Sequence, residues 1–95
     1  MDFQKEQSFT ISEDALFQEV SGETVLLDLV SENYFGLDEA GTRVWALLVE
    51  GASVGQIVNT LLDEYEVDRT TVEKDVNELL GNLVETGLIA VREIG

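Results

Sequence analysis

Apolar and polar residues alternate with a period of two along the first third of the chain. The stretches FTISEDALFQEV (9–20) and TVLLDLV (24–30) both show this alternation, which predicts half-buried strands. Ser21-Gly22-Glu23 supplies a hairpin turn between them, and Ser31-Glu32 a second turn before a short strand at 33–37. The pattern therefore predicts a three-stranded antiparallel sheet in residues 9–37.

At Asp38 the apolar pattern changes to a helical period of 3.6 residues. Asp38 is a good N-cap for a first helix, which Gly51 ends at the C-cap position. Ser53 and Gln56 form a capping box ahead of a second helix. The apolar stripe of the first helix consists of Ala40, Val44, Leu47 and Leu48 with Trp45 on its flank, and that of the second of Ile57, Val58, Leu61, Leu62 and Tyr65.

A third helix begins near Asp68 or Thr70, where Thr70 and Glu73 offer another capping box, and ends at Gly87. Its core stripe is Val72, Val76, Leu79, Leu80 and Leu83. The closing segment LIAVREI predicts a short terminal extension or wing strand. The expected fold is α+β: one domain over residues 1–95, with a three-stranded antiparallel sheet followed by three helices, and with Trp45 and Tyr65 at least partly buried.

Composition argues against catalysis and against a metal or cofactor. The chain has no cysteine and no histidine, which removes the thiolate nucleophile, the commonest general base and the commonest transition-metal ligands. No apolar run approaches the roughly 20 residues that span a bilayer. The N-terminus MDFQKEQSF lacks the basic and apolar regions of a signal peptide. We therefore expect a cytoplasmic protein that is not an enzyme.

The charge balance narrows the class of partner. Twenty acidic and five basic side chains give a net charge of -15. Such a surface repels phosphate, so DNA, RNA and anionic membranes are poor partners. Two interpretations of the acid stay open: it keeps a small protein in solution, or it complements a basic partner surface.

The ordered pattern of these segments is similar to the PqqD-like family. NYFGLDEAGTRVWALL, followed by SVGQIVNTLLDEYEVD and KDVNELLGNLVETGLI, resembles its small winged helix-turn-helix domains, over roughly residues 25–89. The resemblance implies recognition of the leader segment of a ribosomally synthesised, post-translationally modified precursor peptide (RiPP), and delivery to modifying enzymes. The stretches YFGL and GTRVW look more like the stand-alone leader-binding protein of lasso-peptide clusters than like the pyrroloquinoline quinone version.

A third strand that ends a meander leaves one row of N–H and C=O groups unpaired, and an extended peptide can complete it by strand addition. If the third helix lies along that edge, an apolar groove forms between strand and helix, with Tyr34 or Phe35 lining it. The alternative is that both aromatics are ordinary core residues.

The third helix offers two polar flanks to such a groove, one with Asp75, Glu78 and Asn82, the other with Glu73, Asn77 and Val84. The sequence does not choose between them, although the resemblance favours Asp75. A solvated helix face is the alternative for any of these charges. The expected peptide-binding residues are Glu32, Asn33, Tyr34, Phe35, Gly36, Leu37, Lys74 (for an acidic leader side chain), Asp75, Glu78, Leu79 and Asn82.

The function expected is therefore leader binding in lasso-peptide biosynthesis, with a leader peptidase or cyclase as the partner enzyme. One alternative is a chaperone of the pyrroloquinoline quinone precursor that works with a radical SAM enzyme. A winged-helix DNA-binding regulator shares the fold, but its recognition helix at 70–85 carries one lysine among four acids, which phosphate repels.

Overall fold

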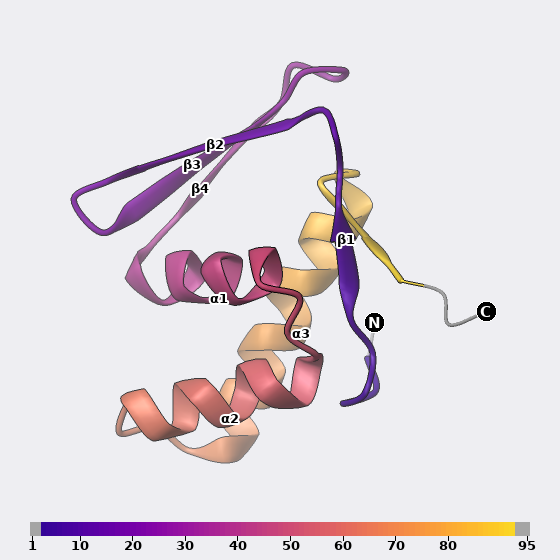
Figure 1. The fold of residues 1–95 in the computed structure, drawn as a ribbon. Coiled ribbons are helices and arrows are strands. Elements are labelled where there is room, and N and C mark those ends of the chain that lie inside the picture. The colour runs from indigo at the N-terminus through magenta and orange to yellow at the C-terminus, as the bar shows by residue number, and fades with distance from the viewer. Residues whose placement is uncertain (1–2, 93–95) are drawn as a thin grey trace.

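A computed structural model describes residues 3–92. It contains a three-stranded sheet, which lies on one side of a group of helices (Figure 1). This arrangement confirms the expected α+β fold, a three-stranded antiparallel sheet followed by three helices. The elements are β1 (Phe9–Ile11), β2 (Ala15–Val20), β3 (Glu23–Asp28), β4 (Tyr34–Leu37), α1 (Glu39–Val49), α2 (Val54–Glu64), α3 (Arg69–Glu85) and β5 (Ile89–Val91).

The sheet has the order β2-β3-β4 and is antiparallel throughout. Ser21 and Gly22 both have positive φ, 54° and 84°, as a two-residue type I′ turn requires. Alternate residues of β3 point to opposite faces. Leu26 is fully buried against the helices, whereas Val25 on the other face is half exposed.

The expected first strand at 9–20 is wrong as a single element, because it divides into β1 and β2. Ser12 to Asp14 form a turn in which the Ala15 N–H donates to the Ser12 carbonyl at 3.2 Å. The Ser12 N–H donates to the carbonyl of Leu88 at 2.9 Å, so the chain changes partner here. The three polar residues Ser12, Glu13 and Asp14 interrupt the apolar alternation at this turn, a turn signal that the expectation of one strand overlooked.

The terminal segment forms β5, which pairs antiparallel with β1 and not with the three-stranded sheet. Figure 1 shows this pair beside the C-terminal end of α3. Phe9 of β1 is buried and makes an edge-to-face contact with Phe3 at 5.2 Å between ring centroids. The last residues of the expected extension, 93–95, lie outside the described residues.

The helix ends follow the expected capping residues, with one change. Asp38 accepts a hydrogen bond from the Gly41 N–H at 2.8 Å, and the Ser53–Gln56 capping box is formed in both directions. Of the two starts expected for α3, Asp68 is the cap, since its carboxylate accepts from the Thr71 N–H. Gly51 lies one residue past the C-cap, with φ +88°, a conformation that glycine adopts readily.

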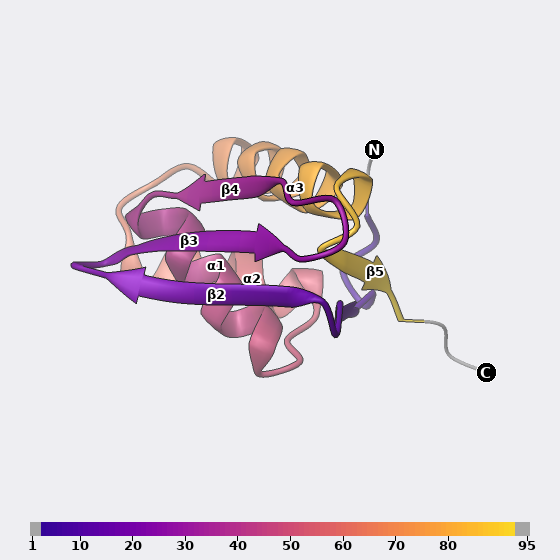
Figure 2. The same cartoon turned by 90° about the horizontal axis from the view of Figure 1, so that it is seen from above.

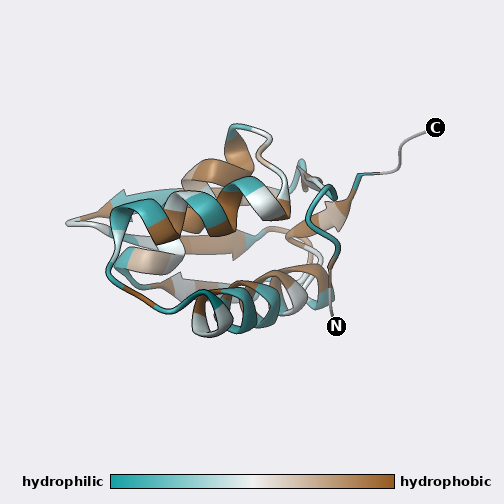
Figure 3. Cartoon of the chain, turned by 90° about the horizontal axis from the view of Figure 1, so that it is seen from below, coloured by the Kyte–Doolittle hydropathy of each residue, from teal (hydrophilic) through white to brown (hydrophobic). Residues whose placement is uncertain are grey.

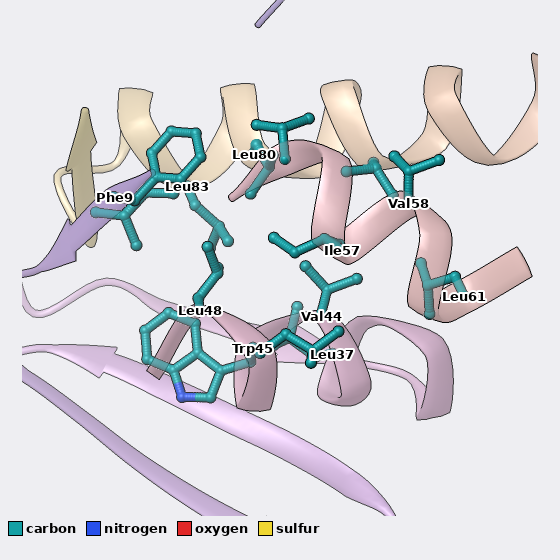
Figure 4. Packing of buried hydrophobic residues seen from close by; sticks show 14 of the residues in the cluster. Phe9, Leu37, Val44, Trp45, Leu48, Ile57, Val58, Leu61, Leu80 and Leu83 are labelled. Carbon is teal, nitrogen blue, oxygen red and sulfur yellow. The ribbon is translucent and has the colours of Figure 1, made fainter. Parts of the chain in front are cut away.

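The core lies where the three helices meet the inner face of the sheet (Figure 4). Trp45 is 3% exposed and contacts Phe17 of β2 edge to face, and Tyr65 is half buried, so both expectations of burial are confirmed. Hydrophobic and hydrophilic segments alternate along α3 (Figure 3), as in an amphipathic helix packed on one side.

Candidate functional site

Strand β4 forms one edge of the three-stranded sheet. The N–H of Asp28 donates to the carbonyl of Asn33, while the N–H of Leu29 donates to Asp14 on the β2 side. Hydrogen bonds of an antiparallel strand alternate in direction, so every second residue of β4 bonds to β3.

That alternation leaves Tyr34 and Gly36 with their main-chain N–H and C=O groups directed away from the sheet. Phe35 and Leu37, opposite Leu26 and Thr24, hold the positions whose main-chain groups face β3. Two donors and two acceptors are therefore available on the free side of β4, which is the requirement for adding a strand.

Beside this edge lies a groove of about 460 Å³ between β4 and α3. Figure 2 shows α3 running alongside β4 in the opposite direction. The predicted residues that line the groove are Phe35, Gly36, Leu37, Asp75, Glu78, Leu79 and Asn82. The structure thus brings together the short aromatic strand and one flank of the third helix.

Apolar side chains form much of the groove lining, and carboxylates of α3 lie beside them. Phe35 and Leu79 are half buried, and Leu37 and Val76 are buried. Asp75 and Glu78 are exposed residues of α3. The groove can therefore hold apolar side chains of an extended peptide, with carboxylates beside them.

The structure chooses between the two flanks of α3. Asp75, Glu78 and Asn82 line the groove. On the other flank, Asn77 accepts a hydrogen bond from the Phe3 N–H at 2.8 Å through its Oδ1 and, with Glu73, lines a separate pocket. Only the first flank lies beside β4.

Four predicted residues do not line the groove. The side chain of Tyr34 is 78% exposed and lies on the opposite face of β4 from Phe35, so only its main chain reaches the free edge. Glu32 and Asn33 belong to the β3–β4 turn, and Lys74 is exposed beside Asp75. A contact between these side chains and a peptide stays a prediction.

Sequence reasoning missed the contribution of α1 and α2 to the groove, which includes Ala40, Gly41, Val44 and Leu61. Gly41 carried a usable signal. A Cβ atom added there would lie 3.2 Å from the side chain of Leu37 and 3.3 Å from Oδ1 of Asp38. The glycine thus permits the close approach of α1 to the end of β4 that closes one end of the groove.

The face of the sheet that points away from the helices is uncovered by other elements (Figure 2) and carries several exposed apolar residues beside Gln18 and Glu23. We call it the outer sheet face, formed by Leu16, Val20, Val25 and Tyr34, each about half exposed or more. Scattered exposed apolar residues are normal, but a contiguous group marks an interaction surface. No helix among the described residues is long and apolar enough to cross a membrane.

Comparison with known proteins agrees with this geometry. Two solved structures resemble the chain with a TM-score of 0.79 each: "TbiB1 in Complex with the TbiA(beta) Leader Peptide", 42% identical over 83% of this chain and 92% of that chain, and "Lasso peptide synthetase B1 complexed with the leader peptide", 29% identical over 87% and 98%. A search of curated proteins finds no match. Residues 23–89 match the profile of the family described as Coenzyme PQQ synthesis protein D (PqqD), and the chain belongs to this family.

Proposed function

We propose that residues 1–95 act as one peptide-recognition domain that binds the leader segment of a ribosomally synthesised precursor peptide in lasso-peptide biosynthesis. The observation that carries this proposal is the open groove beside the free edge of β4. Both similar structures are leader-peptide complexes by name, and they share the fold over most of their length.

Binding occurs by addition of an antiparallel strand to β4. The main-chain groups of Tyr34 and Gly36 pair with the leader, which supplies affinity without regard to sequence. Leader residues opposite Phe35 and Leu37 direct their side chains to the groove, because cross-strand partners share a face. Leu79 and Phe35 provide the apolar contacts for these side chains, and Asp75 and Glu78 favour basic residues beside them.

The chain presents the bound precursor peptide to a modifying enzyme and does not catalyse a reaction itself. Its sequence lacks histidine and cysteine, which supports this role, and the cytoplasm is where precursor peptides are made. The partner is a modifying enzyme such as a leader peptidase or a cyclase. The outer sheet face supplies a docking surface for it that stays separate from the groove.

A chaperone of the pyrroloquinoline quinone precursor is the second candidate, because the family description names that pathway. The lasso assignment is favoured because one similar structure is named as a lasso peptide synthetase B1 with its leader peptide, and the other is also a leader-peptide complex. DNA binding is disfavoured, since α3 exposes Glu73, Asp75 and Glu78 around its one lysine.

A titration with the TbiA(beta) leader peptide tests the proposal. Amide shifts in a ¹⁵N spectrum should concentrate at residues 34–37 and along the groove side of α3. A pyrroloquinoline quinone precursor peptide should bind more weakly in the same experiment. Shifts confined to α2, or no binding of either peptide, would argue against strand addition on β4.

A further inference from the structure

The β3–β4 turn exposes two aliphatic side chains for which the described chain provides no cover. Leu29 is 50% exposed and Val30 is 75% exposed. Turn positions usually carry glycine, asparagine, aspartate or serine, which suit the turn backbone. Two aliphatic residues at such a place break the local rule without a gain in packing, which in a natural protein points to a functional position.

This turn is fixed in one conformation by hydrogen bonds from its base. Asp28, only 8% exposed, accepts from the Val30 N–H at 3.2 Å and from the Ser31 hydroxyl at 2.8 Å. The Glu32 N–H donates to the Asp28 carbonyl at 2.8 Å, and Glu32 adopts a φ of +62°. A left-handed glutamate and a buried carboxylate both cost free energy, so the chain holds the aliphatic pair in place at the expense of its own stability.

The turn lies at the end of the groove from which the modified segment of a precursor emerges. An antiparallel added strand runs against β4, so its N-terminal residues lie near Leu37 and its C-terminal residues near Tyr34. The modified segment follows the leader in sequence and therefore leaves the groove beside the β3–β4 turn.

We propose that Leu29 and Val30 form a further contact, in addition to the outer sheet face, by which a modifying enzyme engages the leader-loaded chain at the point where its substrate emerges. This inference rests on the proposed function and adds the place of handover to it. The enzyme should offer an apolar pocket bordered by lysine or arginine, because Asp14 and Glu32 lie next to the aliphatic pair in the fold. A second copy of this chain is a poor occupant, since each copy has a net charge of -15.

The experiment compares variants in a host cell whose own copy of the gene is deleted. The test variant is the double substitution Leu29→Ser and Val30→Ser, which replaces exposed aliphatic groups by ordinary turn residues. Val67→Ser is the matched control, because Val67 is 47% exposed and lies between α2 and α3. Two quantities are measured by mass spectrometry: precursor that co-purifies with the tagged chain, and mature product.

The double variant should retain precursor within about twofold of the unaltered chain, while mature product falls on the order of tenfold, as for the loss of one good interface contact. The Val67 variant should change neither quantity. Product that stays level, or that falls only in proportion to bound precursor, overturns the inference and leaves leader binding intact. If the unaltered chain retains no precursor at all, the proposed function itself is wrong.

Discussion

At the scale of single residues, Asp38 connects the fold to the groove. Its carboxylate caps α1 through the Gly41 N–H at 2.8 Å, and the same residue lines the groove at the end of β4. Thr70 offered the same kind of signal in the sequence, yet Asp68 caps α3 instead. Capping residues identify a helix start reliably only to within a residue or two when two candidates adjoin.

Replacing Asp38 by alanine should lower the free energy of unfolding by about 1 kcal/mol, because an N–H group at the start of α1 loses its acceptor. Thr70→Ala is the control, since Thr70 lies inside the first turn of α3 and is not its cap. Urea unfolding followed by the fluorescence of Trp45 measures both. An equal loss from the two variants would contradict the assignment of the caps.

At the scale of elements, the helices and the sheet of the three-stranded meander were predictable because each repeats one period over many residues. The polar residues Ser12 to Asp14 also indicated the break between β1 and β2. The pairing of β1 with β5 was not predictable, because short strands choose partners through contacts distant in sequence, such as Ser12 with Leu88. For the groove, the sequence identified β4 and α3 as its two sides, but it did not decide which flank of α3 faces β4. The choice depended on the packing direction of α3, which no local pattern encodes.

Leu79 should provide an anchor for a bound leader. Leu79→Ala should weaken binding of the TbiA(beta) leader peptide by roughly 1 to 3 kcal/mol, as expected when a groove contact is truncated. Calorimetric titration measures the change. Val84→Ala is the control, because Val84 is also a half-buried apolar residue of α3 but lies outside the groove lining. A larger loss of leader affinity in the Val84 variant would contradict the prediction, because it would place the leader on the flank of α3 that faces away from the groove.

The ion pair that joins α1 to α2 gives an expected pH dependence. Arg43 donates to Glu64 through Nε and through Nη2, both at 2.8 Å. This hydrogen bond, with the charge of Arg43, lowers the pKa of Glu64. A carboxyl whose pKa is lower in the folded state stabilises the fold above its unfolded pKa of about 4.3, and the effect disappears as the pH falls through the folded value.

Glu64→Gln should therefore lower the melting temperature at pH 7, and its difference from the unaltered protein should narrow progressively as the pH falls below about 4.3. The loss should be small because both side chains are more than one-third exposed. Glu66→Gln, an exposed position next to the α2 end, serves as the control. A difference between Glu64→Gln and the unaltered protein that persists unchanged at pH 3 would remove the ion pair as its cause.

At the scale of the whole molecule, the chain combines two surfaces with different physical character. The groove offers main-chain pairing and apolar contacts beside β4. The chain as a whole carries a net charge of -15, and its surface outside the groove includes the outer sheet face. Hydrogen bonds and apolar contacts depend weakly on salt, whereas attraction between charged surfaces is screened within about 10 Å at 0.1 M salt.

The two interactions should therefore separate when salt is raised from about 0.05 to 0.5 M. Association of the leader-loaded chain with its modifying enzyme should slow by about tenfold, because complementary charge mainly accelerates encounter. Leader affinity should change by less than about threefold over the same range. Stopped-flow kinetics with the enzyme and calorimetric titration of the peptide measure the two quantities. The opposite outcome, with leader affinity lost and enzyme association unchanged, would assign the acidic surface to the leader instead.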